Sequence, residues 1–398
     1  MVSSVGVSLP EFLKNCNSSL GNILKAGEAG TGTIKDNMDD LCDILEDEIL
    51  KSKSSEEEKK ALLKRLRSFC NTETNIMLVG ATGCGKSSTI NALFAVGEED
   101  KVVETEVIDD DEEDGENRNP QTGAVIRKPV YVEVAKVGSK ADPETKDIEK
   151  YKIGNLVLWD TPGLGDGTEI DEHHKEVITE LLKEEDDEGN ALIDLVLVIL
   201  DGSTRDLGTS YKLLNEVIIP ELKEDTNRIL IALNQADIAM KTGRHWDYEK
   251  NEPDETLIEF LNEKVESIKK RIKEDSDLDV NPVYYCAGYE EESGDVVKPY
   301  NLSKLLYYIM ESLPSQKRVA IMEGINTDSE NYEYNDDDED YNEEIKDSFY
   351  DSFDYISDGV DAGAEIGSTI LGIPGAIVGA VVGGFVGCVK SILDEIFE

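Results

Sequence analysis

One stretch decides how the rest of this chain is organised: Gly80-Ala81-Thr82-Gly83-Cys84-Gly85-Lys86-Ser87-Ser88. An apolar run, 76–79, precedes it, and a segment with a helical pattern, 89–94, follows it. The spacing G-x-x-x-x-G-K-S between a strand and a helix is that of a phosphate-binding P-loop. Its glycines let successive backbone N–H groups surround an anion, and the helix N-terminus adds partial positive charge. We expect Lys86 to reach the β- and γ-phosphates and Ser87 to bind Mg²⁺.

Composition limits the classes of protein to which the chain can belong. Its 398 residues are enough for two or three domains, and its formal net charge is −47. The acids are concentrated in runs at 104–116, 184–188 and 328–344, which usually mark solvated loops or tails. A nucleic-acid groove needs clustered Lys and Arg to displace counterions, so the charge argues against one.

Cysteine usage and the N-terminus bear on the compartment. The six cysteines are dispersed and none forms a C-x-x-C pair, which argues against a disulfide scaffold or a zinc site and favours a reducing cytosol. The N-terminus shows no basic region followed by an apolar stretch, so no signal peptide is predicted. A cytoplasmic protein is expected.

Four regions are predicted along the chain. They are a helical region (1–70), an α/β domain (71–318), an acidic linker with a helix (319–362), and a glycine-rich apolar segment (363–398). In the second region short apolar strands alternate with helices, which predicts a doubly wound, mostly parallel sheet. The expected strands are 76–79, 130–134, 156–159, 195–200, 229–233 and 283–286, and the expected helices are 207–219, 256–272 and 302–313. The first region is expected to hold helices at 34–50 and 55–69.

The first polar motif at a strand end is Asp160-Thr161-Pro162-Gly163, which follows the strand 156–159. Ligands in such sheets bind at the carboxyl ends of the strands. Asp160 is placed like a Walker B carboxylate that holds Mg²⁺ through water. The backbone N–H of Gly163 is placed to contact a γ-phosphate.

The second motif, Asn234-Gln235-Ala236-Asp237, follows the strand 229–233. The Asp237 carboxylate can accept hydrogen bonds from the N1–H and the 2-amino group of guanine, whereas adenine offers neither donor. Adenine would leave a desolvated carboxylate unpaired, so selection of guanine is expected, with Asn234 tethering the loop. A third motif, Cys286-Ala287-Gly288, is placed to give a backbone N–H to the carbonyl of the base.

The order of these motifs resembles the translation-factor-related P-loop GTPases, and within them the Era-like and septin-like members, over roughly residues 71–318. The matching residues are GATGCGKSS (80–88), DTPG (160–163), NQAD (234–237) and CAG (286–288). The resemblance implies a domain that binds GTP or GDP with Mg²⁺ and hydrolyses GTP. It also implies a switch I threonine that closes over Mg²⁺ and the γ-phosphate.

Thr122 is the best match to that threonine, and Thr105 is the weaker candidate. Catalysis is then assigned to Lys86, Thr122 and Gly163. The metal is assigned to Ser87 and Thr122, with Asp160 acting through water.

Three residues depart from the family pattern. Gln235 stands where the family usually has Lys, so affinity is expected to fall while the choice of guanine is kept. Leu164 stands where Ras-like members use Gln to orient the attacking water, and a leucine cannot hydrogen-bond. Gly83 stands where potassium-stimulated relatives carry Asn. Together these predict slow intrinsic turnover, stimulated by dimerisation across the nucleotide face or by a partner.

Three other side chains are candidates to replace the missing glutamine. His173 and His174 are expected at the solvent-exposed start of a helix. Arg205 is an alternative as an arginine finger acting in trans, although a surface salt bridge is the usual role of such an Arg.

The C-terminal segment 366–389 runs 24 residues without a charge. As a helix it would extend about 36 Å, enough for the ~30 Å apolar core of a bilayer. Glycines every four residues from Gly375 to Gly387 would let helices approach closely in a membrane. Gly372-Ile373-Pro374-Gly375 could instead bend the segment into a re-entrant hairpin, and a soluble glycine-rich helix pair is the third reading.

Two classes of function are compatible with these patterns. The first is a GTPase that acts as a molecular switch. The second is a membrane-acting effector or assembly protein in which GTP binding is regulatory and hydrolysis is negligible. An ATP-using P-loop kinase would leave the motif 234–237 without a role.

Overall fold

The computed structural model describes most of the chain between residues 71 and 349. The described residues are 43, 46, 50, 55–57, 59–60, 63, 71–94, 104–108, 130–131, 148–164, 168–186, 189–205, 207–223, 225–240, 245–290 and 296–349. Thr122, most of the predicted N-terminal helices and the segment 366–389 lie outside these residues. Two compact units are formed, one by Met1–Thr72, Ser315–Glu323 and Lys346–Glu398, and one by Glu73–Pro314 with Gly324–Ile345.

The second unit is built on one sheet of eight described strands. Their order is β10-β7-β6-β1-β5-β4-β2-β3. The strands are β1 (Thr74–Gly80), β2 (Glu104–Ile108), β3 (Val130–Tyr131), β4 (Ile148–Ile153), β5 (Leu156–Asp160), β6 (Leu195–Asp201), β7 (Ile229–Asn234) and β10 (Val283–Tyr284). The first five in the order run parallel, whereas β4, β2 and β3 pair antiparallel with their neighbours. The predicted α/β fold with a mostly parallel sheet is therefore confirmed.

Two strands of the sheet were not predicted. β4 reads Ile-Glu-Lys-Tyr-Lys-Ile, in which three charged residues separate the buried Ile148, Tyr151 and Ile153 and no apolar run is formed. β2 lies at the start of the acidic run 104–116, which was expected to be a solvated loop throughout. Its backbone pairs with β4 from Glu104 to Ile108, so that part of the prediction is wrong. Strand pairing satisfies the backbone whether or not the strand is apolar.

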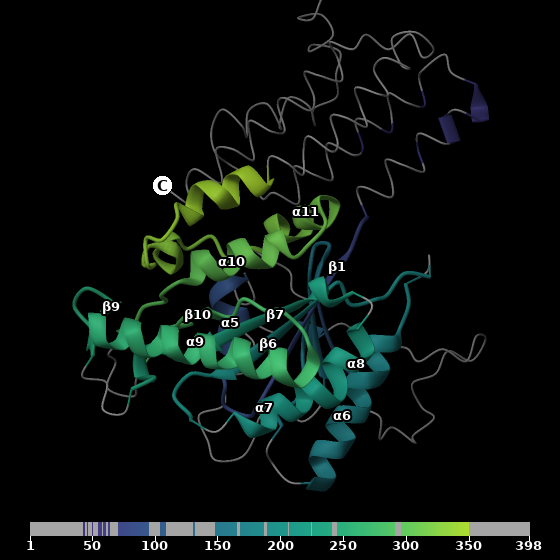
Figure 1. Cartoon of the computed structure of the whole chain (residues 1–398). Coiled ribbons are helices and arrows are strands. Elements are labelled where there is room, and N and C mark those ends of the chain that lie inside the picture. Colours follow the sequence, from purple (N-terminus) through teal and green to yellow (C-terminus); the bar gives the residue numbers. More distant parts are fainter. Residues whose placement is uncertain are drawn as a thin grey trace, which may run out of the picture. The chain divides into compact units, whose positions relative to one another are not determined.

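Helices cover both faces of the sheet (Figure 1). On one face, α6 (Thr168–Lys183), α7 (Gly208–Leu213), the π-helix η2 (Leu214–Ile218), α8 (Ile219–Leu222) and α9 (Glu255–Ser276) share a core with alternate strand residues. On the other face, α5 (Lys86–Leu93) contacts α10 (Leu302–Glu311), and α10 contacts β7. The central strands are continuously apolar over 76–79, 195–200 and 229–233 because both of their faces are buried there.

Two short antiparallel strand pairs lie outside the eight-stranded sheet. They are β8 (Trp246–Asp247) with β9 (Glu252–Pro253), and β11 (Tyr289–Glu290) with β12 (Val296–Val297). The segment after β9 begins α9, whose first turn is capped by the Asp254 carboxylate accepting the Leu257 N–H at 3.0 Å. Of the first unit, the structure describes chiefly α11 (Ser315–Gly324).

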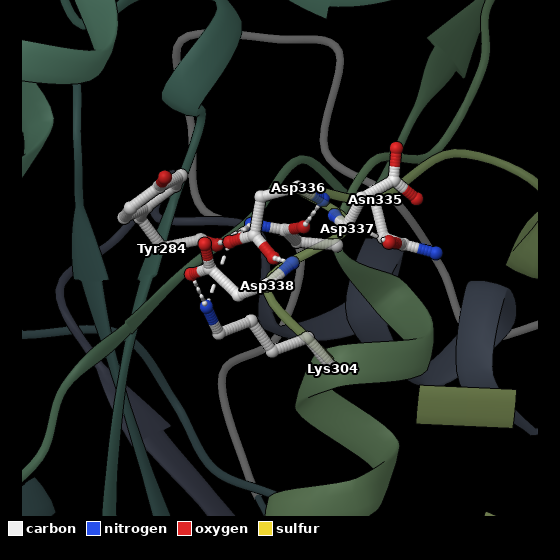
Figure 2. A network of polar contacts seen from close by, with 7 residues as sticks. Tyr284, Lys304, Asn335, Asp336, Asp337 and Asp338 are labelled. Atoms are coloured by element: carbon white, nitrogen blue, oxygen red, sulfur yellow. Dashed lines mark hydrogen bonds and ion pairs between the residues drawn. The ribbon is translucent and has the colours of Figure 1, made fainter. Parts of the chain in front are cut away.

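The acidic run 328–344 packs into the second unit rather than forming the separate linker that was expected. It contains the 3₁₀-helix η5 (Ser329–Tyr332) and the start of a helix at 341–349, and Tyr332 and Tyr341 are almost completely buried. Figure 2 shows how two of its acids are paired: the Lys304 ammonium lies 2.7 Å from Asp336 and 3.1 Å from Asp338. Charge alone did not predict this, because a cation 32 residues away in the sequence supplies the partner.

No helix among the residues that the structure describes is both long enough and apolar enough to cross a membrane.

Candidate nucleotide-binding site

The predicted phosphate-binding loop connects the end of β1 to the start of α5. Gly85, at the N-cap of α5, has a φ of 92°, a left-handed conformation that favours glycine. A Cβ there would lie 2.1 Å from Asn234 Nδ2, so the close approach of the second motif also requires glycine. Lys86 is only 7% exposed, and its ammonium is close enough to Asp160 to act on the pKa of that carboxyl. The backbone therefore has the geometry of an anion-binding turn at a helix N-terminus.

Ser87 and Asp160 meet beside this loop. The Ser87 hydroxyl donates to Asp160 Oδ2 at 2.6 Å. Asp160 is 1% exposed, and its other oxygen, Oδ1, has no hydrogen-bond partner within the described part of the chain. Burial raises the pKa of Asp160 to about 6, although Lys86 and the Ser87 hydroxyl both act to lower it. A buried carboxylate with an unused oxygen can accept a further donor or the water of a hydrated cation.

These two side chains fit a magnesium ion. Mg²⁺ prefers oxygen ligands, keeps several waters and is usually held by one or two protein groups together with substrate phosphates. The described residues contain no group of three or more His, Cys, Asp or Glu that could hold a metal by themselves. Any Mg²⁺ bound here would therefore depend on the nucleotide for further ligands.

Asn234 joins three of the predicted motifs. Its Nδ2 donates to the Cys84 carbonyl at 3.0 Å, and its Oδ1 accepts the Ala287 N–H, also at 3.0 Å. Gln235, in a left-handed conformation with a φ of 62°, donates from Nε2 to the Gly83 carbonyl at 2.8 Å. The amide of Gln235 thus contacts the P-loop backbone where the family has a lysine stem. The loops at the ends of β1, β7 and β10 are therefore joined directly by hydrogen bonds.

Asp237 has the same pattern of contacts as Asp160. It is 1% exposed, its Oδ1 has no partner among the described residues, and its Oδ2 accepts the Tyr289 hydroxyl at 3.2 Å. Burial raises its pKa, and hydrogen bonds from Cys286 and Tyr289 oppose that effect. Oδ1 is therefore a buried acceptor whose capacity no described protein group uses.

Residues 75–235 match the family model described as the 50S ribosome-binding GTPase. The match begins in β1 and ends within the motif 234–237, so it contains the P-loop and Asp160. This segment is a P-loop GTPase domain. A comparison with curated proteins returned no match.

Solved structures with a similar fold share little sequence with this GTPase. Toc33 from Arabidopsis thaliana, in complex with GDP and Mg²⁺, is 16% identical with a TM-score of 0.36, covering 69% of this chain and 96% of its own. Era from Aquifex aeolicus, bound to GDP and AlF4⁻, is 17% identical with a TM-score of 0.31, covering 61% and 57%. A bacterial dynamin of an oligomerised pair is 16% identical with a TM-score of 0.40, covering 87% and 57%. The chain thus spans little more than half the length of the Era and dynamin chains, and similarity at this level shows no substrate or partner.

Leu164 is built into the core of the GTPase domain. It is 2% exposed, its N–H donates to the Gly80 carbonyl at 3.3 Å, and its carbonyl accepts the Thr82 N–H at 3.0 Å. The start of switch II is therefore hydrogen-bonded to the P-loop like a short parallel bridge. A side chain enclosed in this way has no access to an attacking water.

His174 differs from its expected position. It lies in the second turn of α6, is 6% exposed, and its Nδ1 is 3.2 Å from the Gly163 carbonyl, whereas His173 is exposed. The expectation that both histidines are exposed at a helix start is wrong for His174. The spacing of His174 with Ile178 and Leu181 on one helical face is the signal that could have placed it inside. Arg205 is exposed, as either of its two roles requires.

Two predicted residues cannot be placed in this site. Thr122 lies outside the described residues. Thr105 lies on β2, where its backbone pairs with Tyr151 of β4. The structure does not describe its side chain. The assignment of the switch I threonine therefore stays a prediction.

Proposed function

We propose that this chain binds GTP with Mg²⁺ and hydrolyses it to GDP and phosphate, acting as a molecular switch. One observation carries the proposal: two buried carboxylates, Asp160 and Asp237, each keep one oxygen without a partner in the described structure. Asp160 lies beside the P-loop serine, and Asp237 lies beside the loop that Asn234 ties to the P-loop. One carboxylate suits a hydrated metal at the phosphates, and the other suits the two donors of guanine.

The roles of the residues follow from their positions. Lys86 stabilises the negative charge that develops on the phosphates during in-line attack by water. Ser87 would hold Mg²⁺ directly and Asp160 would hold it through water, and the bound ion would neutralise phosphate charge. The Gly163 N–H senses the γ-phosphate, as does Thr122 on the basis of the family resemblance. Loss of that phosphate would release their loops and produce the switch.

Turnover by the isolated chain is proposed to be slow, because Leu164 offers no group to orient water. A second copy meeting across the nucleotide face, or another partner, would supply the missing group. GTP hydrolysis measured against protein concentration tests this. A specific activity that rises with concentration supports a catalytic dimer, and a constant one contradicts it.

Selection of guanine is tested with one substitution. In Asp237→Asn, an amide donor replaces an acceptor, so GTP binding should fall and binding of xanthosine triphosphate, which has a carbonyl at C2, should rise. Asp247→Asn makes the same change at an exposed position in β8 and should leave both affinities unchanged. Equal affinity of the wild-type chain for ATP and GTP, or an Asp237→Asn variant that still prefers GTP, would contradict the proposal.

Membrane contact through residues 366–389 is a separate part of the proposal and rests on the sequence alone. Flotation of the full chain with liposomes, compared with a chain ending at Asp361, tests it. Absence of lipid association by the full chain would remove this part and leave the nucleotide chemistry intact.

A further inference from the structure

Tyr289 comes directly after the motif 286–288 and contacts the residue assigned to read the base. Its hydroxyl lies 3.2 Å from Asp237 Oδ2. A phenol donates and a carboxylate accepts, so this is a hydrogen bond to a charged group, which is stronger than one between neutral groups. No assignment made from sequence motifs includes Tyr289, because the recognised pattern ends at Gly288.

The local backbone is shaped to bring Tyr289 to this place. Gly288 has a φ of 75°, and a Cβ there would lie 2.9 Å from the Val297 carbonyl. The chain turns at this glycine into the hairpin β11–β12, in which Tyr289 pairs with Val297. The contact to Asp237 is therefore made from a paired strand.

Asp237 is also contacted from a second position of the same segment. The Cys286 thiol hydrogen-bonds the carboxylate, and the Gly288 N–H donates to Cys286 Sγ at 3.4 Å. Cys286 and Tyr289 thus both donate from their side chains to Asp237, and the backbone N–H groups of Asp237 and Ile238 also act to lower its pKa. Its Oδ1 has no hydrogen-bond partner among the described residues. Burial raises the pKa of Asp237, and both bonds act against that rise.

Guanine presents two parallel donors, N1–H and the 2-amino group, and both can be met only if the carboxylate lies in the plane of the base. A carboxylate that rotates freely would lose part of this match, as a loosely held group does in any recognition site. A donor fixed on one oxygen stops the rotation and leaves lone pairs for the ligand.

We propose that Tyr289 is a positioning residue for guanine, turning the Asp237 carboxylate so that both of its oxygens meet the base. The inference rests on the proposed GTP function and extends it to a residue outside the four motifs. Tyr289 itself is 39% exposed, so its ring is accessible at the edge of the site while its hydroxyl points inward.

The test compares Tyr289→Phe with the wild-type chain for three nucleotides. Inosine triphosphate has the N1–H of guanine but lacks the 2-amino group, and ATP lacks both donors. Tyr289→Phe should weaken GTP binding about tenfold, as expected for a hydrogen bond to a charged group. It should weaken inosine triphosphate binding less and leave ATP binding unchanged, so that the ratio of GTP to inosine triphosphate affinity falls.

Tyr248→Phe is the matched control, because Tyr248 is an exposed tyrosine close enough to Tyr289 to influence it electrostatically. It should leave all three affinities unchanged, and thermal unfolding should show that both variants fold.

Three results would overturn the inference: unchanged GTP affinity, an equal loss for GTP and inosine triphosphate, or tighter GTP binding by Tyr289→Phe. The last would mean that the phenol competes with the base. A wild-type chain that fails to prefer GTP over ATP would instead refute the proposed function itself.

Discussion

Asp160→Asn should raise the stability of the nucleotide-free protein and reduce the extra stability that GTP and Mg²⁺ provide. The carboxylate is 1% exposed, and its pKa is raised from 3.8 to about 6 by burial. Without nucleotide it is a buried charge with an unused oxygen, so its neutral amide replacement should make the protein more stable at pH 8. With GTP and Mg²⁺ the same change removes a group that would hold the hydrated metal, so stabilisation by nucleotide should shrink.

The magnitude follows from the two pKa values. The folded chain binds this proton more tightly than the unfolded chain, so the stability that Asp160 contributes is present below pH 3.8 and is lost as the pH rises through about 6. A shift of about two units corresponds to about 3 kcal/mol above pH 6, at about 1.4 kcal/mol per unit. About half of this should develop between pH 5 and pH 8.

Urea unfolding of the nucleotide-free protein at several pH values between 5 and 8 measures this. The advantage of Asp160→Asn over the wild type should grow with pH, up to about 3 kcal/mol, with less if the new amide lacks a partner. Asp225→Asn replaces an exposed aspartate and should show no such growth. A variant that is less stable than the wild type at pH 8, or a difference that does not change with pH, would refute the reasoning.

Two further predictions concern residues away from the base and the metal. His174→Ala removes the contact to the Gly163 carbonyl of switch II, so it should lower the single-turnover rate of GTP hydrolysis several-fold without changing the affinity for GDP. His173→Ala, at the exposed neighbour, should change neither the rate nor the affinity. An equal loss of rate in both variants would contradict the role of His174. Lys304→Met leaves the carboxylate of Asp336, whose side chain is 9% exposed, without its cation and should cost about 3–5 kcal/mol in urea unfolding. Lys298→Met, at a more exposed ion pair, should cost less than about 1 kcal/mol, and equal costs would show that burial is not the cause.

Much of the fold was predictable because it depends on local patterns. The apolar strands β1, β5, β6 and β7 and the helices α9 and α10 lie close to their predicted ranges. β4 was missed because three of its six residues are charged, and its buried residues, Ile148, Tyr151 and Ile153, follow no regular period. The packing of 328–344 was missed because its cation, Lys304, is distant in sequence.

At the site, the sequence predicted the motif residues but not the residues that hydrogen-bond to them and hold them in place. Ser87, Asp160, Asn234 and Asp237 carry chemistry that their residue type and position at a strand end reveal. Tyr289 contacts Asp237 only because the turn at Gly288 and the pairing of β11 with β12 bring it there.

By itself, the sequence determined that this chain has a phosphate-binding loop followed by a carboxylate and a guanine-reading motif, because those functions need given residue types at given spacings along the chain. The tertiary structure alone decided which side chains hold the loop, the carboxylate and the guanine-reading motif in position. The enclosure of Leu164, the inward position of His174 and the contact of Tyr289 with Asp237 depend on distances between segments that are far apart in sequence. Spacing along a chain fixes what a loop can bind, and packing between loops fixes how firmly the binding groups are held.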